Sequence, residues 1–157
     1  MTTYLDELAP DLEAPESGRL QLALNVDDLD AAIDFYSRMF GTAPVKVKHG
    51  YANFAIAAPP LKLVLFSGSG EPGTLNHLGV EVASADEVSA AETRLRADGL
   101  ETTEVADTNC CFAAKTETWL EAPDGQRWEW YVKHDDLEGF ACATAPAADE
   151  AATGCCG

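Results

Sequence analysis

One pattern of predicted elements occurs twice along the chain. Its first copy begins with QLALNV at residues 21–26, where leucine and valine alternate with more polar residues, as in a strand with one buried face. An amphipathic helix is predicted at residues 29–40, with Asp27 or Asp28 as its N-cap and Gly41 as its end. Three short strand-like runs follow, the last being LKLVLFS. The first copy therefore reads βαβββ.

The second copy follows the same order. HLGVEVA at residues 77–83 predicts a strand, and a helix follows in which Ser84 and Glu87 form a capping box. TTEVADT, FAAKTETWLEA and RWEWYVK supply three more strand-like runs, with a PDGQ turn before the last. Matching Gln21 with His77 gives a repeat of 56 residues. The sequence therefore predicts an α+β fold of two tandem βαβββ modules.

The length of 157 residues suits one domain with short tails. We expect a single domain at residues 19–140, with modules at about 19–68 and 75–135. Residues 1–18 are acidic and contain two prolines, which predicts a flexible leader. Residues 141–157 are small and polar without a core pattern, which predicts a disordered tail that contains cysteines.

Charge and composition exclude several classes of partner. A net charge of −17 argues against nucleic acid and anionic membranes, because phosphates are bound by lysine and arginine. The sequence contains no apolar run of about 18 residues that could span a membrane, and its first residues do not follow the secretory signal pattern. With five cysteines, an odd number, we expect a cytoplasmic protein with reduced thiols. Lys46, Lys48 and Lys62 are expected to be surface residues of strands.

Aligning the two copies nominates a metal site. Gln21 matches His77, and placing LKLVLF on RWEWYV matches Leu63 with Glu129. Equivalent strands of a duplicated, curved sheet meet around its cleft, so Gln21, His77 and Glu129 are expected to line one cavity, while Leu63 contributes no ligand. An amide oxygen, an imidazole nitrogen and a carboxylate form an open set close to the facial triad of non-haem iron(II) oxygenases. Taken singly, such a histidine is more often structural and such a glutamine more often on the surface.

Glu129 is the most informative of the three residues. It lies between Trp128 and Trp130, and strand alternation places both indoles on the opposite face. A carboxylate that points into a cleft is costly unless it is paired or bound to a metal.

Cys110 and Cys111 are adjacent in the stretch TNCCFAAKTETW. Paired thiolates select soft ions such as trivalent arsenic or cadmium. Strand alternation would separate the two side chains, so a loop or bulge is expected here, and residues 107–109 (DTN) favour one. The alternative is a pair of small buried hydrophobic residues. Cys155 and Cys156 repeat the pair in the tail, either as accessory thiols that capture the metalloid first or without a role.

Residues 20–135 resemble the vicinal oxygen chelate superfamily, also called the glyoxalase, bleomycin-resistance and dioxygenase group. The segments QLALNVDDLDAAIDFYSRMFGTAP, GYANFAIAAPPLKLVLF, LNHLGVEV and DGQRWEWYV, with the double cysteine, narrow the resemblance to organoarsenical carbon–arsenic lyases and cadmium-induced proteins. That family more often shows QDKVW where this chain has KTETW, so Glu117 stands in place of a lysine.

The resemblance implies that the two tandem βαβββ modules form a curved mixed sheet around a metal-binding cleft. It implies an iron(II) site there with Gln21, His77 and Glu129 as ligands, in which other divalent metals are possible in vitro. It implies arsenic binding by Cys110 and Cys111, and a non-haem iron dioxygenase-type lyase that uses dioxygen to cleave trivalent methyl- or aryl-arsenicals to arsenite, for arsenic detoxification. The expected partners are this small molecule and dioxygen, with the chain as monomer or homodimer. Two alternatives stay open: a cadmium- or arsenite-binding protein without turnover, and a generic glyoxalase or extradiol-dioxygenase-type metalloenzyme.

Overall fold

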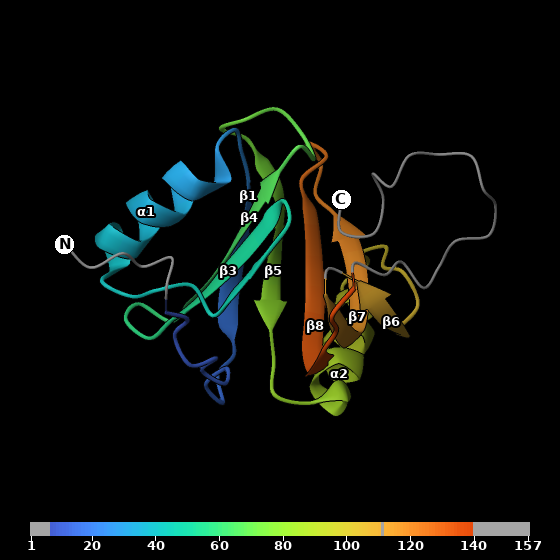
Figure 1. The fold of residues 1–157 in the computed structure, drawn as a ribbon. Coiled ribbons are helices and arrows are strands. Elements are labelled where there is room, and N and C mark those ends of the chain that lie inside the picture. The colour runs from blue at the N-terminus through green and yellow to red at the C-terminus, as the bar shows by residue number, and fades with distance from the viewer. Residues whose placement is uncertain (1–6, 111, 140–157) are drawn as a thin grey trace.

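The computed structural model describes residues 7–110 and 112–139, which form eight strands and two helices (Figure 1). The elements in chain order are β1 (Arg19–Val26), α1 (Leu29–Phe40), β2 (Lys46–Lys48), β3 (Tyr51–Ile56), β4 (Leu61–Ser67), β5 (Leu75–Glu81), α2 (Ala85–Ala97), β6 (Ala106–Cys110), β7 (Ala113–Glu121) and β8 (Arg127–Asp136). This is the predicted βαβββ order, repeated once.

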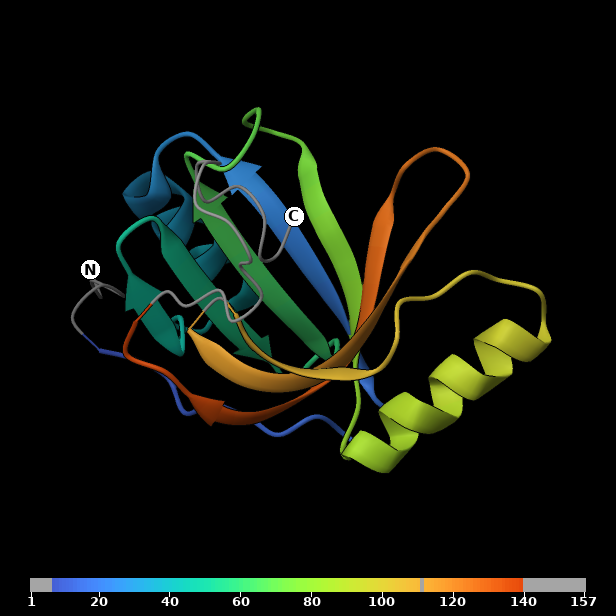
Figure 2. The same ribbon diagram turned by 90° about the vertical axis from the view of Figure 1, so that its right-hand side faces the viewer.

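All eight strands belong to one curled, mixed sheet with the order β2-β3-β4-β1-β5-β8-β7-β6 (Figure 2). Each half pairs its first and last strands in parallel, β1 with β4 and β5 with β8. The halves meet where β1 runs antiparallel to β5. The predicted α+β fold with two modules in one curved sheet is confirmed, and both modules close within a single chain.

The helices begin and end where their capping residues predict. Asp28 Oδ1 accepts a hydrogen bond from the Ala31 backbone N–H at 3.0 Å, and Gly41 ends α1 with a φ of 66°. Ser84 Oγ accepts from the Glu87 backbone N–H at 3.2 Å at the start of α2. Figure 1 shows α1 beside the first half and α2 beside the second, so the helices leave the inner side of the curved sheet to the strands.

Two buried apolar clusters lie on opposite faces of the first half. The cluster that packs against α1 consists of Ile33, Ala52, Phe54, Ile56, Leu63 and Leu65. The cluster on the inner face consists of Ala23, Tyr51, Val64, Phe66, Cys110 and Phe112. Alternate residues of β4 thus serve two different cores, which requires a fixed register.

That register corrects one match between the modules. Gly79 pairs with Glu129 in the second half, and Ala23, one repeat earlier, pairs with Val64 in the first. The residue equivalent to Glu129 is therefore Val64, and the match with Leu63 was wrong by one residue. A slip of one residue moves a side chain to the other face of the sheet, and Leu63 indeed lies in the cluster against α1. The fourth position is apolar either way.

The segment before the double cysteine is a strand, contrary to the loop expected there. Residues 107–109 belong to β6, whose pairing with β7 continues to Cys110 opposite Ala113. Backbone hydrogen bonds to a neighbouring strand outweigh the turn preference of Asp, Thr and Asn here. The chain reverses directly afterwards, with Phe112 at a φ of 64°. Cys111 lies outside the described residues.

The described part of the leader, from residue 7 to β1, contains no helix or strand. It is held at Ala9, whose N–H donates to the Pro44 carbonyl at 2.9 Å, and at Asp11, which pairs with Lys62 and Lys133. The tail at 141–157, including Cys155 and Cys156, lies outside the described residues. Neither α1 nor α2 is long and apolar enough to cross a membrane.

Candidate metal centre

The side chains of Gln21, His77 and Glu129 meet on the inner face, where β1, β5 and β8 lie side by side. Gln21 Nε2 lies 2.6 Å from Glu129 Oε1 and 3.1 Å from His77 Nε2, and His77 Nε2 lies 3.4 Å from Glu129 Oε1. All three residues are buried, Glu129 completely. The structure thus brings together the three residues that the aligned repeats nominated.

Glycine at position 79 leaves room for this contact. Gly79 lies on β5 opposite Glu129, and a Cβ atom at this position would lie 2.9 Å from Glu129 Cγ. A side chain here would displace the carboxylate from the cluster, so the close approach requires glycine. The glycine in HLGVEVA was a signal for this approach that the sequence analysis did not use.

Asn76 orients the imidazole of His77. Its Oδ1 lies 2.8 Å from His77 Nδ1, and its own amide donates to Asn25 Oδ1 at 3.1 Å. With Nδ1–H donating to Asn76, the lone pair of Nε2 faces Gln21 and Glu129, which is the arrangement of a metal-binding histidine. Asn76 and Asn25 were missed in the sequence, because their role depends on the pairing of β1 with β5.

Gln21 completes the set through its amide. Its Nε2 group donates to both neighbours, while its Oε1 accepts a hydrogen bond from the Tyr131 hydroxyl. Rotation of the amide by half a turn would direct Oε1 at a cation, and Tyr131 could then accept from Nε2. The donor set fits an ion that prefers nitrogen and oxygen ligands. Within residues 7–110 and 112–139, no three His, Cys, Asp or Glu side chains form such a set, so this site depends on the amide.

Lys115 supplies a positive charge beside the cluster. Its Nζ lies 3.4 and 3.3 Å from the two oxygens of Glu129 and 4.6 Å from the centre of the Tyr131 ring. Burial alone would raise the pKa of Glu129, but the ammonium group of Lys115 is the main opposing cause and the pKa falls to about 2. Glu129 is therefore a carboxylate at neutral pH. Lys115 was missed in the sequence, although it lies two residues before Glu117 and therefore on the same face of the strand.

Glu117 lies two residues further along β7 and is also buried. Its Oε2 has no hydrogen-bond partner among the described residues. Burial and the nearby Glu129 carboxylate raise the pKa of Glu117. The residue that departs from the resembled family thus lies beside the metal-ligand candidates.

Cys110 lies in the inner-face cluster with Val64 and Phe66, and the Phe66 ring centre is 6.2 Å from that of His77. Cys110 is disulfide-bonded, which corrects the expectation of reduced thiols at this position. Its partner lies outside the described residues. Cys110 must be reduced before its sulfur can bind a soft ion.

A cavity of about 30 Å³ lies beside the cluster. Gln21 and His77 line it, and so do Lys46 and Lys62, which extend from β2 and β4. Lys62 is buried, and only 13% of the Lys46 side chain is exposed, so the expectation that both are surface residues was wrong. Alternation shows which residues of a strand share a face, but not which of the two faces the curved sheet encloses.

A mixed, curled sheet of two βαβββ halves around a buried cluster is the architecture of the glyoxalase and dioxygenase group. The family model for the glyoxalase/bleomycin resistance protein/dioxygenase superfamily matches residues 18–130, and the chain belongs to this superfamily.

Two groups of relatives have similar sequences. The trivalent organoarsenical cleaving enzyme of Thermomonospora curvata is 54% identical over 126 residues, covering 80% of this chain and 83% of that protein. The cadmium-induced protein CadI of Mycobacterium tuberculosis is 53% identical over 140 residues, covering 88% and 92%.

Solved structures confirm the fold. The 2,3-dioxygenase LapB of Pseudomonas sp. KL28 is similar with a TM-score of 0.56 and 17% identity, covering 76% of this chain and 42% of that one. The Mn(II)-bound glyoxalase of Novosphingobium aromaticivorans is similar with a TM-score of 0.53 and 18% identity, covering 79% and 43%.

Proposed function

We propose that this protein is an iron(II)- and dioxygen-dependent lyase that cleaves the carbon–arsenic bond of trivalent organoarsenicals and releases arsenite. The observation that carries the proposal is the contact among Gln21, His77 and Glu129, in a chain whose Cys110 lies in the cluster on the inner face of the same sheet. The similarity to a trivalent organoarsenical cleaving enzyme over 80% of the chain supports this choice of substrate.

Gln21, His77 and Glu129 would hold the metal. A ferrous ion held there would supply open positions for the activation of dioxygen. Asn76 keeps His77 Nε2 directed at this site, and Tyr131 holds the amide of Gln21 in either orientation. Lys115 keeps Glu129 ionised, so the carboxylate is ready to accept a cation without first losing a proton.

The role of Cys110 and Cys111 is to bind trivalent arsenic through sulfur. Cys110 lies on β6 within the cluster of Val64 and Phe66, which continues to His77. Arsenic held there would place its organic group on the inner face of the sheet. Proximity in one cleft is the main contribution of such a clamp. Cys155 and Cys156 would act as accessory thiols.

A second candidate function is sequestration of cadmium or arsenite without turnover. The similarity to a cadmium-induced protein over 88% of the chain favours it. Binding by the cysteines alone would need neither iron nor dioxygen. The two candidates therefore differ in what happens to the carbon–arsenic bond.

Arsenite release distinguishes the two candidates. Reduced, metal-free protein is loaded with iron(II) under nitrogen, given phenylarsenite and then exposed to air, and the arsenic species are separated by chromatography. We expect arsenite only when both iron and air are present. If the protein binds phenylarsenite but releases no arsenite, the lyase proposal is overturned and sequestration becomes the favoured function.

Glu129→Gln provides the matched test of the metal ligands. It should lower arsenite release by more than about 100-fold, because the site loses its only carboxylate. Binding of phenylarsenite to the reduced cysteines should persist in this variant. Glu121→Gln, which changes an exposed carboxylate on β7, should behave as the unmodified protein.

A further inference from the structure

Four of the five lysines in the chain line the cavity on the inner face of the sheet. They are Lys46, Lys62, Lys115 and Lys133, and they extend from β2, β4, β7 and β8. The fifth, Lys48, does not line the cavity and pairs with Glu138 at 3.2 Å. In a chain with a net charge of −17, almost all lysines thus meet in one place.

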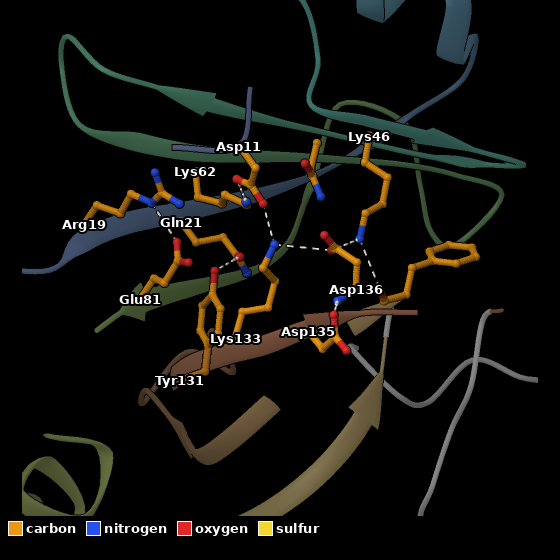
Figure 3. Close-up of polar contacts among 12 residues, drawn as sticks. Asp11, Arg19, Gln21, Lys46, Lys62, Glu81, Tyr131, Lys133, Asp135 and Asp136 are labelled. Carbon is orange, nitrogen blue, oxygen red and sulfur yellow. Dashed lines mark hydrogen bonds and ion pairs between the residues drawn. The ribbon is translucent and has the colours of Figure 1, made fainter. Parts of the chain in front are cut away.

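Most charges of this cluster have a carboxylate from a strand beside them. Lys115 pairs with Glu129, and Lys46 pairs with Asp136 at the end of β8. Arg19, next to the lysines, lies 2.6 Å from Glu81 (Figure 3).

Lys62 and Lys133 are different, because both pair with a residue of the leader. Asp11 Oδ1 lies 3.2 Å from Lys62 Nζ, and Asp11 Oδ2 contacts Lys133 Nζ. One carboxylate thus bridges two ammonium groups, with one oxygen for each (Figure 3). Lys133 also reaches Asp136 at 3.2 Å, but Asp11 is the only ion-pair partner of Lys62 among the described residues.

The position of Lys62 makes its partner important. The residue is 4% exposed, and burial lowers its pKa despite the nearby carboxylates of Glu81 and Asp11. A buried ammonium group without an anion is costly. Glu81 of β5 is near Lys62 but pairs with Arg19. Among the described residues, the carboxylate in contact with Lys62 therefore comes from the leader and not from a strand.

The segment that supplies Asp11 is weakly held. It has no helix or strand, and most of its residues are exposed. The Asp11 side chain itself is 29% exposed. Such a segment can leave the surface when another carboxylate takes the place of Asp11, because Lys62 and Lys133 remain on β4 and β8 and Lys62 keeps an anion.

We propose that Lys62 and Lys133, with Lys46 beside them, form a binding site for the carboxylate of a small molecule. Asp11 occupies this site as an intramolecular ligand and competes with the external one. The occupant that the structure shows is a carboxylate with one oxygen on each lysine, which defines the chemistry of the ligand. The site requires neither a metal nor the cysteines, so it stands or falls independently of the proposed lyase activity.

Benzoate tests the site, with benzamide as its uncharged analogue. Binding to the metal-free full-length chain is measured by isothermal titration calorimetry. We expect Asp11→Asn to bind benzoate about tenfold or more tightly than the unmodified protein, because the intramolecular competitor is removed. Benzamide should bind to neither protein.

Lysine variants in the Asp11→Asn background locate the binding site. Lys62→Met and Lys133→Met should each abolish benzoate binding, and Lys48→Met should not affect it. Lys133 is partly exposed, so its variant tests the proposal even if loss of the buried Lys62 disturbs folding, which circular dichroism would reveal. The proposal is overturned if Asp11→Asn binds benzoate no more tightly than benzamide, or if Lys133→Met and Lys48→Met have equal effects.

Discussion

Glu117 carries a carboxylate into the interior of the sheet, where a second carboxylate, Glu129, already lies. Burial and this neighbour raise the pKa of Glu117 above the ordinary value of 4.5. Folding therefore favours the protonated form of Glu117 relative to the unfolded chain. The stability that protonated Glu117 contributes is complete below the ordinary pKa of a glutamate. It is lost as the pH rises through the raised pKa of Glu117.

Replacement of Glu117 by Gln should prevent this loss of stability at high pH, because glutamine does not ionise. At about pH 8 we expect the free energy of unfolding to rise by about 1 kcal/mol, the typical cost of one buried polar group without a partner. The gain should shrink towards about pH 4, where Glu117 is protonated. Urea unfolding of both proteins at the two pH values measures this difference.

Glu121→Gln is the control, because Glu121 lies on the same strand and is exposed. It should change stability by no more than about 0.5 kcal/mol at either pH. A gain for Glu117→Gln that is as large in acid as in alkali would show that the carboxylate charge is not its cause.

At the scale of single elements, the start of α1 depends on one N-cap residue. The sequence predicted either Asp27 or Asp28 for this position. In the structure Asp28 accepts from the Ala31 N–H, and Ile33 of this helix is fully buried against β3 and β4. The helix start therefore positions part of the core.

Asp28→Ala should lower the free energy of unfolding by about 1 kcal/mol, because a backbone N–H of the first turn loses its acceptor. Asp27→Ala changes the neighbouring exposed carboxylate and should have little effect. Thermal unfolding followed by circular dichroism compares the two variants. Equal losses would mean that general charge near the helix N-terminus, and not the cap, stabilises α1.

Strand boundaries were predictable to within a few residues, but pairing partners were not. QLALNV was identified by its alternation, and LKLVLFS and RWEWYVK as strand-like runs, and β1, β4 and β8 cover them. The match of Leu63 with Glu129 failed because residues 63–66 (LVLF) are all apolar, so their pattern does not show which of them faces the inner side of the sheet. Residues 107–109 form a strand because β7 lies beside them, which no local pattern reveals.

For the whole molecule, the metal-ligand candidates connect the two halves of the sheet. Gln21 belongs to β1 in the first half, and His77 and Glu129 belong to β5 and β8 in the second. Binding of a metal by all three would therefore require the junction of β1 with β5, and would stabilise the entire fold.

We expect Mn(II) to raise the free energy of unfolding of the metal-free protein by about 2.7 kcal/mol at about 100 times its dissociation constant. His77→Ala should abolish this effect. His49→Ala, which changes an exposed histidine, should retain it. If Mn(II) stabilises the His77→Ala variant equally well, the three residues are not the metal site.

The sequence by itself determined the order of elements, the duplication and the three residues that meet in the cluster. These follow from local periodicity, from capping residues and from a repeat that maps one half onto the other. Only the tertiary structure decided which charges surround the cluster: Lys115 beside Glu129, and Asp11 between Lys62 and Lys133. Those contacts join strands and a leader that lie far apart in the chain. They depend on how the sheet curls, which no periodicity within a single segment records.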